Sequence, residues 1–118
     1  MIVGHVTTDG DPVVTIDIHG ARRFRIEAIL DTGFTGHLCL ARRYEKRVRL
    51  VRLGDIESEL ADGSCVTQPE YAAEVSFDGE RRRVLVMLTD SRDSLIGTAL
   101  LRKKRVAIDF PRRRVVVR

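Results

Sequence analysis

The chain has 118 residues, of which 43% are hydrophobic and 32% are charged, and its formal net charge is +4. This length suits one domain with a single core, and we expect residues 1–118 to form that domain. No segment approaches the about 18 uninterrupted apolar residues of a transmembrane helix, which argues against a membrane protein.

The positive charge raises the question of nucleic acid. The basic residues are mostly arginine and fall into clusters at 42–43, 81–83, 102–105 and 112–114. A basic stripe can hold phosphate groups. Aromatic residues, however, make up only 5% of the chain and Trp is absent, which leaves little for bases to stack on. Because 17 acidic residues are interspersed with the basic ones, we expect a solvated surface rather than a nucleic-acid groove.

The N-terminus and the cysteines bear on the compartment. The first residues, Met1 to His5, lack the basic and apolar regions of a signal peptide, so we expect a cytoplasmic location. Only two cysteines are present, Cys39 and Cys65, and Cys39 lies in an apolar run, which favours reduced thiols. Neither has metal-ligand spacing with a histidine, so we expect no metal and no cofactor.

Alternation of apolar and polar residues dominates the chain and predicts β-strands. It is clear at 14–18 and 24–30, whereas the run Val84 to Leu88 is apolar on both faces and suits a central strand. Turn signals separate these runs, the strongest being Asp78-Gly79, where both residues tolerate the positive φ of a type I′ turn. Helical patterns are confined to Ala41–Lys46 and to Thr98–Lys103, with Thr98 as a candidate N-cap.

These patterns predict a mainly β domain of about eight or nine short strands, closed or nearly closed into a β-barrel, with one or two short helices. The apolar run Val115 to Val117 would invite aggregation as a free edge. Pairing with the N-terminal strand at 2–7, or with the terminus of a second copy, would cover it. The sequence leaves both pairings open.

The most informative motif is Asp31-Thr32-Gly33, which follows the apolar run Ala28 to Leu30 and precedes a second apolar run at 37–40. A carboxylate placed where a strand ends, in a turn of a hydroxyl residue and a glycine, suits acid–base chemistry. The glycine permits a close approach of backbone or substrate, and the threonine can fix the loop by hydrogen bonding. A second motif, Leu95-Ile96-Gly97, lies downstream, between a strand-like and a helix-like segment.

The order of apolar-Asp-Thr-Gly, long hairpin and apolar-apolar-Gly resembles the retropepsin-like aspartic proteases, and in particular their small bacterial and archaeal single-domain members. The resemblance spans about residues 13–110, but only 31–36 and 95–97 are specific to the family. It implies the acid-protease type of barrel. It further implies that Asp31 is the shared acid and base and that Thr32 hydrogen-bonds across the dimer axis. Gly33 would offer its backbone to the substrate or to the pair of aspartates.

Further roles follow from the same resemblance. Leu95, Ile96 and Gly97 would pack behind the active-site loop. A β-hairpin from about Ile56 to Tyr71 would close over the substrate as a flap, and its turn would be formed by Ala61, Asp62, Gly63 and Ser64. Such a flap would exclude water and bind an extended peptide as an added strand.

The chemistry also bears on assembly. Peptide hydrolysis by water needs a base to activate the water and an acid to protonate the leaving group, and two aspartates in contact supply both. The chain has one Asp-Thr-Gly and no near copy of it. A two-fold axis through Asp31 would supply the second carboxylate, so an enzyme of this kind has to be a C2 homodimer. Its substrate would be a peptide or protein.

Each motif also has a simpler interpretation. Asp31 can be a turn residue that binds a nearby backbone N–H, residues 95–97 can be core, and 62–64 can be any hairpin turn. His37 then is a partly exposed structural residue. Ser64 and Ser94 lack the sequence context of a serine nucleophile. On this interpretation the protein is a non-catalytic dimeric β-barrel that binds an acidic partner or nucleic acid through its arginine clusters.

Overall fold

The computed structural model describes all 118 residues and has ten strands and two short helices. The first strands are β1 (Ile2–Val6), β2 (Pro12–Ile18), β3 (Phe24–Leu30), β4 (Leu38–Ala41) and β5 (Val51–Glu59). The others are β6 (Cys65–Phe77), β7 (Glu80–Thr89), β8 (Ser94–Ile96), β9 (Val106–Asp109) and β10 (Arg114–Val117). The helices are a 3-10 turn, η1 (Arg42–Arg47), and an α-helical turn, α1 (Thr98–Leu101). Neither is long and apolar enough to cross a membrane.

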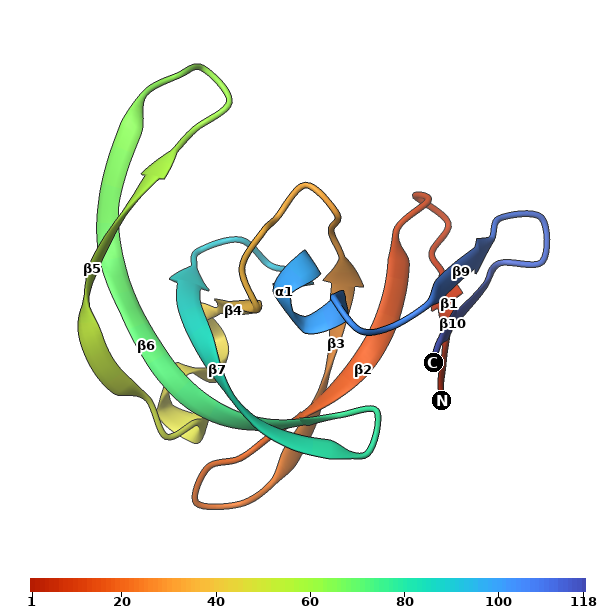
Figure 1. Ribbon diagram of the computed structural model, residues 1–118, viewed down its shortest axis with the longest axis horizontal. Helices are drawn as coiled ribbons and strands as arrows, with labels where there is room; N and C mark the ends of the chain where they lie inside the picture. Colours follow the sequence, from red (N-terminus) through yellow and green to blue (C-terminus); the bar gives the residue numbers. More distant parts are fainter.

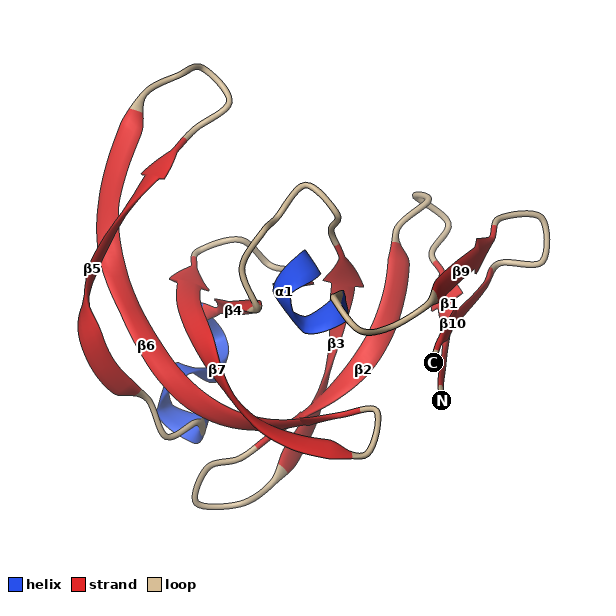
Figure 2. Cartoon of the chain, in the orientation of Figure 1, coloured by secondary structure: helices blue, strands red, loops and turns tan.

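The expected mainly β fold is confirmed (Figure 2). All strands belong to one sheet, in the order β5-β6-β7-β4-β8-β3-β2-β1-β10-β9. Pairing of β2 with β6, at Ile18 and Val75, closes the strands from β6 to β2 into a ring. The strand count exceeds the expected eight or nine, since β8 and β9 are too short to show a periodic pattern.

The core fills this ring. The alternation in β2 and β3 places Val14, Ile16 and Ile18 inside, together with Phe24, Ile26, Ala28 and Leu30. The central run of β7 contributes Val84, Val86 and Leu88. The interior is therefore built from the periodic positions of the sequence. The residues between them, mostly polar in β2 and β3 but Leu85 and Met87 in β7, lie on the other face.

Two long hairpins, β5–β6 and β6–β7, share the strand β6. At the β6–β7 turn, Asp78 and Gly79 both have positive φ, 52° and 76°, as the sequence predicted. The hairpin of β5 and β6 is longer than the expected 56–71, because pairing continues to Val51 and Ala72. It extends away from the ring on the same side as the loop that follows β3 (Figure 1).

The termini pair within the chain. β1 pairs with β10 antiparallel, with Ile2 opposite Val117, and β9 then pairs with the other side of β10. The question that the sequence left open is thus answered for the single chain. The sheet now ends at β9 (Figure 1).

The expected helix over Thr98–Lys103 is shorter, and Thr98 is not its N-cap. Gly97 holds that position and makes no side-chain cap. The Thr98 N–H instead donates to the Phe34 carbonyl at 2.8 Å. The helix start is therefore fixed by the loop after β3 rather than by a side chain.

Gly97 is the tightest point of this contact. A Cβ atom there would lie 2.2 Å from the Gly36 carbonyl oxygen and 2.7 Å from that of Phe34. Both neighbours are backbone atoms, which do not move aside as the end of a flexible side chain does.

We therefore predict that Gly97→Ala lowers the free energy of unfolding by about 1–3 kcal/mol, because the loop and the helix have to separate. Chemical denaturation measures this change. The control is Gly33→Ala in the loop after β3, where the one close neighbour of a Cβ is Asp31 Oδ1 at 3.2 Å. Equal destabilisation by the two variants would contradict the prediction.

Candidate active site

The Asp-Thr-Gly segment lies in the loop of residues 31–37, between β3 and β4. The strand β8 lies between these two strands, parallel to β3 and antiparallel to β4. The Asp31 N–H donates to the Ile96 carbonyl at 2.9 Å, and the Gly97 N–H donates to the His37 carbonyl at 3.0 Å. Both ends of the loop are thus bound to the segment Leu95-Ile96-Gly97.

The middle of the loop is held in the same way. Phe34 and Gly36 accept hydrogen bonds from the N–H groups of Thr98 and Ala99, at 2.8 and 3.2 Å. Ile96 is fully buried behind the loop, whereas Thr32 and Gly33 are exposed. The structure therefore brings the two sequence motifs together, with the polar one facing out.

Asp31 is half-buried at the start of this loop. Its Oδ1 accepts a hydrogen bond from the Gly33 N–H at 2.9 Å. This contact fixes the orientation of the carboxylate and leaves Oδ2 for another partner. It is the local hydrogen bond that the simpler, turn interpretation of Asp31 expects.

A cavity of about 500 Å³ lies between this loop and the β5–β6 hairpin. From the loop and β4 it is lined by residues 33–38, from β7 by Leu85 and Met87, and from the hairpin by residues 56–59, Gln68 and Glu70. The Gln68 amide lies 3.4 Å from Ser58 Oγ and 3.3 Å from Met87 Sδ, which links both hairpin strands to the ring. The lining combines apolar side chains, such as Leu85 and Met87, with polar and acidic ones.

The hairpin turn lies beyond this cavity. Ala61, Asp62, Gly63 and Ser64 are exposed and do not line it in the single chain. The lining residues Ile56, Gln68 and Glu70 were not singled out from the sequence. The strand pairing of the hairpin is the feature that identifies them. Ile56 lies opposite Gln68, and Glu70 follows Gln68 by two residues on the same face.

The charge around the cavity is divided. Three glutamates line it, Glu57, Glu59 and Glu70, and none of them forms an ion pair. A neighbouring, mainly basic pocket of about 320 Å³ is lined by four basic residues, Arg82, Arg102, Lys103 and Lys104, and by one acidic residue, Glu80. His37 lines both. Burial lowers the pKa of His37, the charges of Arg82 and Arg102 lower it further, and Glu70 opposes them.

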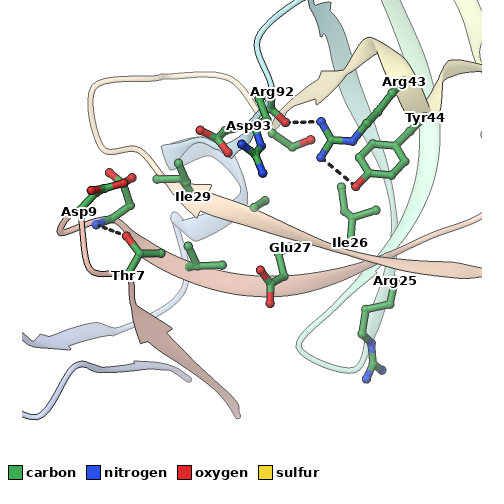
Figure 3. A pocket seen from close by; sticks show the side chains of 14 residues that line it. Thr7, Asp9, Arg25, Ile26, Glu27, Ile29, Arg43, Tyr44, Arg92 and Asp93 are labelled. Carbon is green, nitrogen blue, oxygen red and sulfur yellow. Dashed lines mark hydrogen bonds between the residues drawn. The ribbon is translucent and has the colours of Figure 1, made fainter.

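A separate cavity of about 540 Å³ lies beside β3 (Figure 3). Its lining mixes acidic and basic side chains, and Arg43 donates hydrogen bonds to the Arg92 carbonyl and to the Tyr44 hydroxyl. No residue of the 31–37 loop lines it. No group of three His, Cys, Asp or Glu side chains in the structure is arranged to hold a metal ion.

The other potential nucleophiles are one serine, Ser94, and the two cysteines. Ser94 is buried, and its Oγ accepts a hydrogen bond from the Ala41 N–H at 3.0 Å. Cys39 is half-buried in β4, and burial raises the pKa of its thiol, which keeps it protonated. Cys65 is exposed at the start of β6, and both cysteines are free.

The turn of the hairpin is organised by Asp62. Its Oδ1 accepts hydrogen bonds from the Ser64 hydroxyl at 2.6 Å and from the Ser64 N–H at 2.9 Å. These bonds favour the charged carboxylate and lower the pKa of Asp62. Since the folded pKa is the lower one, their contribution to the turn is present above the unfolded pKa and is lost as the pH falls through the folded value.

We predict that Ser64→Ala raises the pKa of Asp62 toward its ordinary value, because the stronger of the two hydrogen bonds is removed. An NMR titration of the side-chain carboxyl carbon measures the pKa. Ser58→Ala in the same hairpin, which has no contact with Asp62, is the control and leaves that pKa in place. A pKa that does not move in Ser64→Ala would contradict the prediction.

Comparison with known proteins adds a likeness in structure. No protein-family model and no curated protein matches the sequence. A retropepsin-like aspartic protease from Rickettsia conorii is 19% identical over 98% of this chain and 88% of that chain, with a TM-score of 0.66. A foamy viral protease-reverse transcriptase, solved with an RNA/DNA hybrid, is 12% identical over 77% of this chain, with a TM-score of 0.57.

The match spans 12% of the length of the viral chain and nearly all of the bacterial one. At such low identity the likeness concerns the course of the backbone. It agrees with the resemblance found from the two sequence motifs, and it covers the ring, the hairpin and the loop between β3 and β4. The chain therefore has the mainly β fold of the retropepsin-like aspartic proteases.

Proposed function

We propose that the protein is a homodimeric aspartic endopeptidase that hydrolyses extended peptide segments, with water activated by Asp31 of each subunit. The observation that carries this proposal is the loop of residues 31–37. Backbone hydrogen bonds to residues 96–99 hold it in place, and Gly33, whose N–H binds the Asp31 carboxylate, lines the cavity beside the long hairpin.

The proposed chemistry uses two carboxyl groups that share one proton. One carboxylate takes a proton from water as the oxygen attacks the peptide carbonyl carbon, while the other carboxyl group protonates the carbonyl oxygen. The C–N bond then breaks as the nitrogen receives a proton, and an acid and an amine leave. Each chain supplies one Asp31, so the second copy is required for the reaction rather than merely for stability.

The other residues have supporting roles in this proposal. The Gly33 N–H orients the Asp31 carboxylate, and the exposed Thr32 is placed to hydrogen-bond with the partner subunit. Leu95, Ile96 and Gly97 hold the loop from behind. The β5–β6 hairpin closes over an extended peptide, with Ala61 to Ser64 at its tip, and its inner strand residues line the groove.

We predict that Asp31→Asn abolishes peptide hydrolysis, because an amide neither takes the proton from water nor returns it. A fluorogenic peptide library measures the rate. Asp9→Asn, an exposed carboxylate in the β1–β2 loop, is the control and retains the rate of the unmodified protein. Hydrolysis that persists in Asp31→Asn would refute the assignment.

The pH and concentration dependence test the shared dyad. A pair of carboxyl groups with one proton between them gives a rate that is favoured by acid, and a site built from two subunits gives a specific activity that rises with protein concentration. Rates measured from pH 3 to pH 8 over about a hundredfold range of concentration test both features. A specific activity that stays constant over the whole range of protein concentration would contradict a site built from two subunits.

A second candidate function rests on the basic pocket. Arg82, Arg102 and Lys103 line it without an ion-pair partner in the chain, whereas Lys104 is paired with Asp78 at 2.9 Å. On this alternative the domain is a non-catalytic module that binds an acidic partner or nucleic acid there. Its affinity would then fall steeply with salt, and Arg102→Glu would weaken it further, which a binding titration at two salt concentrations measures. Binding that is insensitive to salt would exclude it.

A further inference from the structure

The mainly basic pocket of about 320 Å³ adjoins the groove between the 31–37 loop and the β5–β6 hairpin, and His37 lines both. Its basic residues come from two parts of the chain. Arg82 lies in β7, and the other three, residues 102–104, follow α1. Because β8 and α1 separate these parts in the sequence, the positive charge is gathered by the fold.

Most of this charge is unbalanced. Lys104 is held by Asp78 at 2.9 Å, and both side chains are mostly buried. The other three basic residues form no ion pair, namely Arg82, Arg102 and Lys103. The lining has one acidic residue, Glu80. Since like charges repel and their neighbours do not compensate them, an anion in the pocket would be stabilised.

Arg82 is placed differently from a freely solvated arginine. It lies on the same side of β7 as the buried Val84 and Val86, and it is opposite the fully buried Val75 of β6. Its side chain is half-buried in this row. A guanidinium group restricted in this way loses little freedom on binding, and its planar fork suits a carboxylate.

His37 connects the pocket to the groove. The Leu85 N–H lies 3.5 Å from His37 Nδ1, and Leu85 lines the groove. The charges of Arg82 and Arg102 also reach His37, where they lower the pKa of the imidazole. A ligand that extends from the groove past His37 therefore meets the two arginines.

The groove itself has the opposite charge. Glu57, Glu59 and Glu70 line it, and none of them forms an ion pair. An acidic residue of a peptide would meet like charges within the groove and opposite charges past His37. The position of such a residue along the peptide therefore matters.

We propose that the basic pocket binds an acidic side chain of the peptide in the groove, with its carboxylate held by Arg82 and Arg102. This inference rests on the proposed function for the bound peptide, and it deepens that function by naming the class of substrate. In the proposed homodimer the pocket occurs twice. The preferred substrates then carry Asp or Glu at equivalent positions on both sides of the scissile bond.

The test compares peptides that differ only in charge. Each peptide carries two Glu residues placed symmetrically about the scissile bond, their distance from it varies along the series, and each has a counterpart with Gln. Blocked ends leave side chains as the only variable carboxylates. We expect kcat/KM for Glu to exceed that for Gln by about tenfold or more at one distance and not at the others.

The arginines of the pocket are then replaced. We expect Arg102→Gln to bring kcat/KM for the preferred Glu peptide down to that of its Gln counterpart, and Arg82→Gln to do the same. Arg102 is exposed, so its replacement tests the pocket without altering the half-buried row of β7. The matched control is Arg105→Gln, an exposed arginine outside the pocket, which keeps the preference.

Three results overturn the inference. The first is equal kcat/KM for Glu and Gln peptides at every distance. The second is a preference that survives in Arg102→Gln. The third is a gain from a free C-terminus in a peptide without Glu, since the pocket would then bind chain ends rather than acidic side chains.

Binding separates this inference from the proposed function. Fluorescence anisotropy of labelled peptides on Asp31→Asn protein measures affinity without hydrolysis, and we expect the same preference for Glu at the same distance. If the unmodified protein cleaves no peptide while this preference depends on Arg102, the pocket stands and the peptidase is refuted. If hydrolysis depends on Asp31 but no distance favours Glu, the peptidase stands and the pocket is refuted. Affinity that is equal wherever Glu lies also overturns the inference and favours the non-catalytic module.

Discussion

The structure of the site depends on one crossing of two backbone segments. Residues 31–37 and 96–99 are joined by four hydrogen bonds between main-chain groups, from Asp31 to Ile96, Gly97 to His37, Thr98 to Phe34 and Ala99 to Gly36. Since the bonds use the main chain, the loop is fixed whatever its side chains do, and those side chains are free to face a substrate. The requirement on sequence is a residue without a side chain where the segments touch, and Gly97 satisfies it, because a Cβ atom there would meet the carbonyl oxygens of Gly36 and Phe34.

The hairpin is connected to this crossing through one long strand. The C-terminal half of β6 lies in the ring, where Ala73, Val75 and Phe77 are buried, and its N-terminal half leaves the ring to pair with β5 alone. Its side chains change from apolar to polar at about Tyr71. The hairpin therefore has a fixed base and an exposed end held by its turn, which is the arrangement expected of a segment that opens and closes over a groove.

The sequence predicted most of this, and its errors have physical reasons. Strands with clear alternation, such as 14–18 and 24–30, were found because one face had to be buried. The Asp78-Gly79 turn was found because few residues adopt positive φ. Thr98 was misassigned as a cap because the partner of its N–H, Phe34, lies 64 residues away in sequence. The groove residues Gln68 and Glu70 were missed for a similar reason, since only tertiary structure places them opposite the loop.

A symmetric site formed by two copies of this chain would have to bind a peptide, which is an asymmetric ligand. In the proposed dimer every group of the groove occurs twice, so Glu70 and His37 would flank both ends of a bound peptide, whose N-to-C direction is not symmetric. The same surface would then meet different substrate residues on the two sides of the scissile bond. Selectivity has to come from features that substrate residues on either side of the scissile bond tolerate, such as the apolar side chains of Leu85 and Met87 that line the cavity. The charged residues that line the groove would add a preference only where a substrate carries a matching charge at equivalent positions on both sides of the scissile bond. The two halves of a homodimeric site are identical, so they cannot select different residues on the two sides.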